Sequence, residues 1–96
     1  MLVNKGYTKG DVVSVKLIGG EEVIARFESE DDKELTINKP MSVVPGPQGL
    51  GMMPWMFLAN TEQDLKLRQN TIVAIAKPKK EAADQYLQGT TGIALA

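Results

Sequence analysis

Apolar and polar residues alternate in short runs along the first three quarters of the chain, and this period of two is typical of half-buried β-strands. The pattern predicts a first strand within 11–18 and a second within 22–28. Gly19 and Gly20 join them, because adjacent glycines supply the positive φ that a tight hairpin turn needs. A third strand covers 35–43 and bends at 38–40, where the sheet must accommodate a proline.

Two further strands are predicted after a loop. Segment 45–51 holds two prolines and three glycines, a composition that predicts a loop rather than a ladder. A long, bent fourth strand then begins in the apolar run 52–59, is interrupted at 60–63 and is completed in 64–68. After a tight polar turn, the β-branched run 71–75 predicts a fifth, buried strand.

The end of the chain changes its period from two to between three and four. Pro78 suits the first turn of a helix, and the pattern predicts a short amphipathic helix over 78–88 that stops at Gly89. A helix of this length is marginal alone, so we expect it to pack over an open end of the sheet. The tail 89–96 is small and weakly apolar, and we expect Ile93 and Leu95 to dock on a neighbouring surface.

Composition narrows the class of protein. With 96 residues the chain is expected to form one domain, 1–96, and near this size burial between subunits adds useful stability. No run is long enough for a membrane span and the start lacks the apolar segment of a signal peptide, so we expect a soluble, intracellular protein. The absence of Cys and His removes disulfides, the usual zinc ligands and the commonest general base. An enzyme is therefore not expected.

The turn before the fifth strand carries the most specific pattern. It resembles the second motif of the Sm and Sm-like (LSm, Hfq-like) family, which reads Ile-Arg-Gly-Asn, one free position, Val and a later Ile. Gln69 stands where the family has Gly. The matching positions are Leu67, Arg68, Asn70, Ile72 and Ile75.

This resemblance implies a mainly β fold, in which a strongly bent, five-stranded antiparallel sheet closes over about 11–77 into a small Sm-like, SH3-type barrel with a short C-terminal helix. Ala25 stands where the family prefers a small residue for a bend in the second strand. The usual N-terminal helix is not predicted here, because Gly6 and Gly10 break the segment. The chain as a whole is similar to Sm-like proteins of cyanophage-type viral sequences.

In the Sm family the turn contributes part of an RNA-base pocket, and the loop between the second and third strands supplies an Asp and an Asn. Asp31 or Asp32 matches that Asp, but Glu34 or Leu35 stands in place of the Asn. Segment 28–34 carries five carboxylates and one lysine, which is typical of a solvated loop and repels phosphates. It lacks the spacing of an EF-hand, so no metal site is predicted.

The candidate nucleic-acid-binding residues follow from the turn and from that acidic loop. A guanidinium can stack on a base and hold a phosphate at once, so Arg68 is the leading candidate, and Asn70 can bond a base edge. Gln69, Asp31 and Asp32 complete the set. The alternative for Arg68 is a salt bridge to one of the two aspartates.

The candidate subunit-interface residues lie in the fifth strand and in the Met- and Trp-rich run, since the family pairs the fifth strand with the next subunit of a ring. They are Thr71, Ile72, Val73, Ile75, Met53 and Trp55.

These observations predict a non-enzymatic, homo-oligomeric ring that binds single-stranded RNA or DNA in nucleic-acid processing. The alternative is a structural or protein-interaction ring, such as a viral assembly factor, that binds no nucleic acid. Eleven basic and twelve acidic residues give a net charge of −1, so any nucleic-acid site must be local. We expect no cofactor, metal, membrane partner or small-molecule substrate, and a cytoplasmic location in a bacterial or infected host cell.

Overall fold

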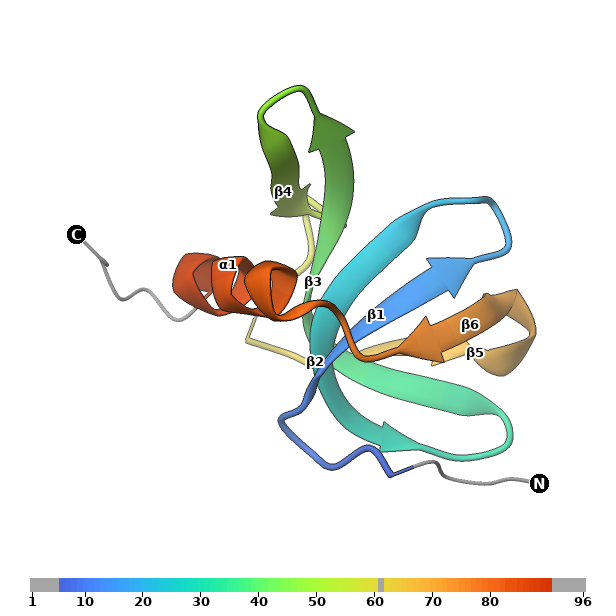
Figure 1. Ribbon diagram of the computed structural model, residues 1–96. Helices are drawn as coiled ribbons and strands as arrows, with labels where there is room; N and C mark the ends of the chain where they lie inside the picture. Colours follow the sequence, from blue (N-terminus) through green and yellow to red (C-terminus); the bar gives the residue numbers. More distant parts are fainter. Residues whose placement is uncertain (1–5, 61, 91–96) are drawn as a thin grey trace.

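A computed structural model describes residues 6–60 and 62–90, which form a bent antiparallel sheet and one helix packed beside it (Figure 1). The mainly β class is confirmed. The strands are β1 Val12–Leu17, β2 Glu22–Glu30, β3 Glu34–Gly46, β4 Gly49–Pro54, β5 Leu65–Arg68 and β6 Ile72–Ala76, and the helix is α1 Lys80–Thr90.

The sheet has six strands rather than the predicted five, because the predicted fourth strand is two separate strands. β4 pairs with the second half of β3 and β5 pairs with its first half, while the described residues between them, 55–60 and 62–64, lie outside any ladder. The strand order is β4-β3-β2-β1-β6, with β5 beside β3. Within the described residues no ladder joins β5 to β6, so the sheet does not close into a continuous barrel.

The predicted bend in the third strand is confirmed, and β3 continues through it. Arg26 pairs with Asn38 and Ile24 pairs with Met41, so Ala25 alone faces both Lys39 and Pro40. This two-against-one arrangement is a β-bulge, which bends the strand and gives proline a place outside the regular ladder. Lys39 has a φ of 52°, the left-handed conformation that the first residue of one class of β-bulge adopts.

The predicted loop 45–51 is wrong, because most of it is paired. Pro45 pairs with Leu50 and Gly46 with Gly49, so β3 and β4 form a hairpin that projects from the top of the molecule in Figure 1. The last β3 residue paired with β2 is Ser42, so at Pro45 only one side of β3 is occupied. Proline has no backbone N–H to donate, and on this unpaired side of β3 there is no ladder hydrogen bond to lose. Gly49, with a φ of 118°, closes the turn.

The core lies on the inner face of the bent sheet. Alternate residues of β1 and β2 fill it, as the sequence predicted, together with residues of β3 and β5. The buried cluster is Val13, Val15, Leu17, Val23, Ala25, Phe27, Leu35, Ile37 and Leu67. Ile72 and Ile75 of β6 pack against the cluster, which secures β6 to the core as well as to β1.

The N-terminal segment covers one opening of the core without forming a helix in its described part. The ring of Tyr7 packs on the ring of Phe27 with centroids 5.8 Å apart. The Tyr7 hydroxyl donates a hydrogen bond to the carbonyl of Ile75 at 3.2 Å. Tyr7 therefore links β2 to β6, the two strands that flank β1.

Helix α1 is confirmed, but its end and its packing differ from the prediction. Gly89 lies inside the helix and does not adopt positive φ, and the hydroxyl of Thr90 donates to the Tyr86 carbonyl at 2.8 Å. The Tyr86 hydroxyl reaches the carbonyls of Asn38 and Lys39 at 3.2 and 2.7 Å. The helix therefore packs against the β3 bend and not over an opening of the core (Figure 1).

Burial on the two faces of β2 agrees with this position of α1. Ile24 is buried but lies outside the main cluster, because it alternates with Val23 and Ala25 and so faces the other side of the sheet. Tyr86 is likewise buried outside that cluster. In the described part of the chain no helix has both the length and the apolar character needed to cross a membrane. The predicted tail contacts of Ile93 and Leu95 lie outside the described residues.

Candidate nucleic-acid interface

The turn that carries the candidate motif is short and is held by hydrogen bonds. β5 ends at Arg68, residues Gln69–Thr71 make one turn of 3-10 helix, and β6 begins at Ile72. The Thr71 hydroxyl donates to the Arg68 carbonyl at 2.7 Å, and the Thr71 carbonyl accepts from the N–H of Ile18 at 2.8 Å. These two hydrogen bonds hold the backbone next to Asn70, from which the exposed side chains of Arg68 and Asn70 extend.

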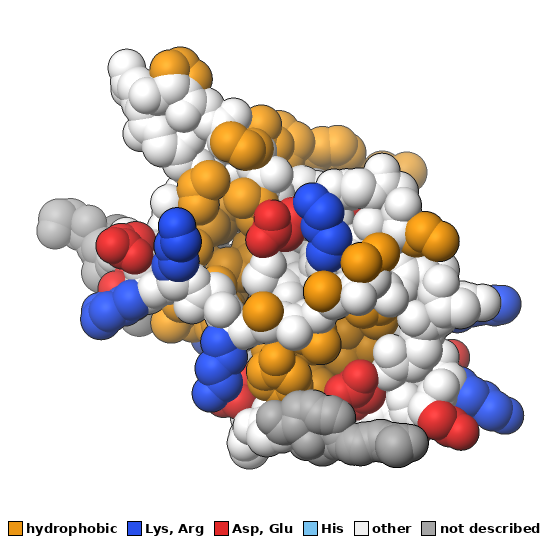
Figure 2. Space-filling view, turned by 45° about the vertical axis from the view of Figure 1, so that its right-hand side comes forward, with side chains coloured by type: hydrophobic (Ala, Val, Ile, Leu, Met, Phe, Trp, Pro, Cys, Tyr) orange, Lys and Arg blue, Asp and Glu red, His pale blue; other side chains and the backbone are white. Residues whose placement is uncertain are grey.

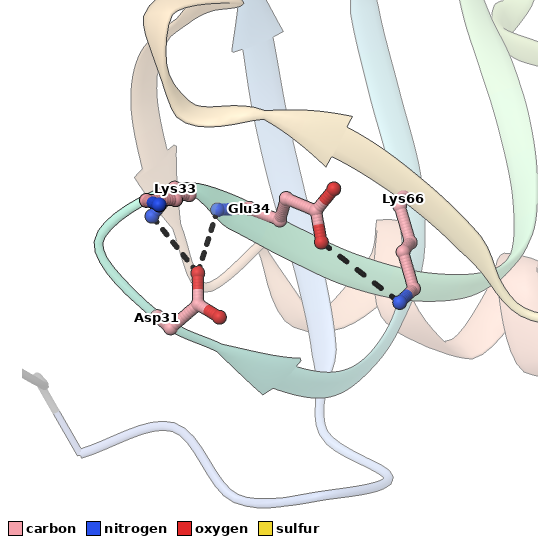
Figure 3. A network of polar contacts seen from close by, with 4 residues as sticks. All are labelled: Asp31, Lys33, Glu34 and Lys66. Carbon is pink, nitrogen blue, oxygen red and sulfur yellow. Dashed lines mark hydrogen bonds and ion pairs between the residues drawn. The ribbon is translucent and has the colours of Figure 1, made fainter.

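The turn between β2 and β3 is organised by Asp31. One oxygen of its carboxylate accepts the backbone N–H groups of Lys33 and Glu34, both at 2.8 Å (Figure 3). The N–H of Asp31 donates to the carbonyl of Glu34 at 2.9 Å. The two hydrogen bonds that the carboxylate accepts lower the pKa of Asp31, because they stabilise its ionised form, and the bond from the Glu34 N–H has the larger effect.

Gln69 joins the two turns. Its side-chain amide donates to the Glu30 carboxylate at 2.8 Å and to the Asp31 carbonyl at 2.9 Å, and its backbone N–H donates to the Lys33 carbonyl at 2.9 Å. Gln69 stands where the motif that this turn resembles has a glycine. Its side chain and backbone connect the two turns by these hydrogen bonds. Gln69 therefore has a structural role, and its amide N–H groups are already occupied.

The two turns enclose an open pocket of about 390 Å³. Arg68 enters it from the end of β5, directly opposite Glu34 in the β3 to β5 register. Glu34 is instead paired with Lys66 at 3.9 Å (Figure 3). The pocket is lined by Asp32, Lys33, Glu34, Arg68, Gln69 and Asn70.

Arg68 is exposed and forms no ion pair with any carboxylate of the described residues. The alternative in which Asp31 or Asp32 neutralises it by a salt bridge is therefore not what the structure shows. Asp31 uses its carboxylate to hold its own turn, and Asp32 lines the pocket with no described hydrogen bond of its side chain. The guanidinium remains available for a ligand.

The structure brings the predicted residues Asp32, Arg68, Gln69 and Asn70 to one pocket and places Asp31 directly behind it. Lys33 and Glu34 also line it, and the sequence reasoning did not single them out. The signal was present, since both lie in the turn that holds Asp31 and Asp32. In the sequence both belong to the charged segment 28–34, and Glu34 is one of the two residues that can stand in place of the Asn in the resembled motif. Two acidic and two basic side chains line the pocket, so its local charge is nearly balanced.

The predicted interface residues fall into two groups. Ile72, Ile75 and Trp55 are half-buried and pack against the core of their own subunit, and Thr71 lies in the fixed turn. Val73 and Met53 are exposed, on β6 and β4. Each of these two strands pairs with another strand on one side only within the described residues. On the outer side of β4 the carbonyl of Leu50 accepts a hydrogen bond from the side-chain amide of Gln85 in α1 at 2.8 Å.

Neither a metal site nor a similar known protein assigns a function to this chain. Among residues 6–60 and 62–90, no three carboxylates gather in a way that would hold a metal ion. The chain matches no protein-family model and no curated protein sequence. Function must therefore be argued from the pocket and the sheet edges.

Proposed function

We propose that this protein is a non-enzymatic, homo-oligomeric Sm-like ring that binds single-stranded RNA or DNA in the pocket around Arg68. The observation that carries the proposal is the unpaired Arg68 guanidinium at the mouth of a pocket built by two cross-linked turns. The resemblance of 67–75 to the second Sm motif supports it. The succession of β5, the 3-10 turn and β6 also resembles the strand-turn-strand of that motif.

The chemistry of the pocket suits a single base with its phosphate. An arginine guanidinium can stack on a base or hold a phosphate, and Asn70 offers both a donor and an acceptor to a base edge. Single strands are favoured because their bases can leave the stack and enter a pocket. Asp32 and Glu34 weaken attraction to phosphates, so one site binds weakly and the repeated sites of a ring must act together.

The edges of β4 and β6 that pair with no strand among the described residues support the ring, with Gln85 of α1 bound at Leu50 of the β4 edge. They lie at opposite ends of the strand order, so one subunit can offer β4 to the β6 of the next. Such a head-to-tail contact closes into a ring when its rotation permits. Closure also covers two open edges that would otherwise invite uncontrolled strand pairing.

Fluorescence anisotropy with short, labelled, uridine-rich and adenine-rich single strands tests the nucleic-acid proposal. We expect micromolar or weaker binding by wild type at low salt, weakening steeply as salt is added. Arg68→Ala should lose most of it, since a stacked base contributes about 1–3 kcal/mol. Lys79→Ala is the matched control, because it removes an exposed positive charge outside the pocket. Equal binding by Arg68→Ala and wild type would overturn the proposal.

A second candidate is a structural or protein-interaction ring, such as a viral assembly factor. The observation that favours it is the set of exposed apolar side chains on β4 and in the segment after it, including Met53, Met56 and Phe57. Wild-type protein that forms a ring but binds no oligonucleotide at low salt would favour this second candidate.

A further inference from the structure

Large apolar side chains are exposed at two separate ends of the sheet. One group follows the β3–β4 hairpin and the segment behind it, and the other lies beside the start of β6. Residues 41–60 contain no charged residue at all, and Figure 2 shows hydrophobic side chains without charged ones on the part that projects at the top. The first group is Val44, Leu50, Met53, Met56, Phe57 and Leu58, and the second is Ile18 and Val73.

The segment 56–58 is held at the surface by the residue before it. The backbone N–H of Trp55 donates to the Pro40 carbonyl at 3.1 Å, and its indole N–H donates to the Glu21 carboxylate at 3.2 Å. Its ring packs against the core. With Trp55 fixed in this way, Phe57 is 74% exposed and Leu58 is 99% exposed. Exposed apolar side chains that are contiguous and anchored indicate an interaction surface.

The second group also presents apolar side chains in fixed positions. Ile18 is 72% exposed, and its N–H bonds the Thr71 carbonyl, which places it beside the start of β6. Lys16 pairs with Ala74 and Leu17 with Ile72, so Val73 has no partner in the ladder and lies in a bulge, 65% exposed. β6 itself carries no charge along its length.

We infer that segment 56–58 of one subunit docks on Ile18 and Val73 of the next subunit, forming an apolar clasp. The inference rests on the proposed ring and names a contact within it. All strand pairs of the sheet are antiparallel. An antiparallel contact between β4 and β6 places Pro54, the end of β4, opposite Ile72, the start of β6. The chain after Pro54 then continues towards the second apolar group.

The charge pattern supports a second copy of this chain as the occupant. The clasp segment and the whole of β6 are uncharged, so neither surface attracts a charged partner, and each removes apolar area of the other from water. The two surfaces differ from each other, which is what a head-to-tail contact requires.

Cysteine cross-linking tests the clasp directly, because the natural chain contains no cysteine. The double variant Leu58→Cys with Ile18→Cys should give a ladder of covalent oligomers under a short thiol-specific cross-linker. The double variant Leu58→Cys with Glu81→Cys is the control and should give none, since Glu81 lies on α1. A ring that shows no Leu58–Ile18 ladder would overturn the clasp and leave the ring standing. A monomeric wild type would overturn both.

Removal of the apolar groups gives a second readout. Phe57→Ser with Leu58→Ser should raise the concentration at which the ring half-dissociates by roughly tenfold or more, given the usual effect of burying such side chains. Val44→Ser removes an apolar side chain that is also exposed but lies on β3, away from the clasp, and should leave that concentration nearly unchanged. Equal effects of the two changes would overturn the clasp.

Discussion

The hydroxyl of Tyr86 donates a hydrogen bond of 2.7 Å to the carbonyl of Lys39, a residue in the left-handed conformation. One side chain of α1 thereby holds the bulge at which β3 bends. The bend directs the two halves of β3 to different partners, β5 on one side of the bend and β4 on the other. The pocket turn and the projecting hairpin are therefore positioned by the same contact.

Alkaline pH should destabilise the protein through Tyr86. Burial raises the pKa of Tyr86 to about 12, from the ordinary value of 10.0, so the unfolded chain loses this proton first. Stability should be intact below pH 10 and should fall by about 2–3 kcal/mol as the pH rises to about 12. Denaturant unfolding at several pH values measures this decline.

Tyr86→Phe isolates the contribution of that hydroxyl. At neutral pH it should cost about 1–2 kcal/mol, because two backbone carbonyls lose a donor. It should also remove part of the alkaline decline. The pKa of Lys80 is also raised, by its hydrogen bond to Asp84, and this contribution is common to both proteins, so the difference between the two proteins is the quantity to measure. Identical pH profiles would contradict the buried position of Tyr86.

Gln69→Ala and Asn70→Ala should separate structure from binding. Gln69→Ala removes both side-chain bonds between the two turns, and we expect a loss of about 1–2 kcal/mol together with weaker oligonucleotide binding. Asn70→Ala removes an exposed side chain that has no described hydrogen bond, so stability should change by less than about 0.5 kcal/mol while binding weakens. Thermal unfolding and anisotropy measure the two effects. A larger loss of stability in Asn70→Ala than in Gln69→Ala would contradict the structural role of Gln69.

Acid should loosen the turn between β2 and β3 through Asp31. Because the folded pKa of Asp31 lies below its ordinary value of 3.8, the stabilisation is present above that pH and is lost as the pH falls through the folded pKa. Asp31→Asn should remove this part of the acid sensitivity. Unfolding midpoints of both proteins, measured from about pH 5 to about pH 2.5, give the difference. Parallel curves would show that the carboxylate does not hold the turn.

Neutralising Asp32 should strengthen binding of single strands. Asp32 lines the pocket and repels phosphates, so Asp32→Asn should tighten binding by roughly two- to fivefold at low salt, an effect that added salt suppresses. Glu81→Gln makes the same charge change on α1 and serves as the control. Equal gains from both variants would place the effect in the net charge of the protein and not in the pocket.

Val73→Lys should dissociate the ring while leaving the subunit folded. The substitution adds a charge at the exposed, unpaired bulge of β6, and charged residues at an edge oppose strand pairing. Light scattering should report a monomer, and circular dichroism should retain the strand signal. Val44→Lys, on β3, is the control that should stay assembled. An intact Val73→Lys ring would mean that β6 is not at the interface.

The sequence predicted the elements whose pattern has a simple local cause. The alternation in β1 and β2 and the Gly19-Gly20 turn are of this kind, as is the apolar face of α1 that carries Tyr86. The bend at 38–40 was also predicted, because a proline inside a strand pattern has few acceptable positions.

The missed features depend on pairing between distant residues. Pro45 and Gly46 are poor strand formers, and they are in a strand because β4 folds back on them beyond the last contact with β2. The pocket around Arg68 likewise depends on contacts between residues that are distant in the sequence. Arg68 was found from its motif, whereas its freedom from ion pairs depends on Asp31 bonding its own turn and on Lys66 taking Glu34.

The pairing of β6 with β1 alone also has a consequence for the order of folding during synthesis. β1, β2 and β3 are joined by short turns and can pair as soon as they leave the ribosome, whereas β6 is made near the end of the described chain. Until then one edge of β1 and the apolar core beneath it stay uncovered. A folding intermediate in which Ile72–Ala76 has not yet paired therefore exposes the β1 edge and is prone to pair with a strand of another chain.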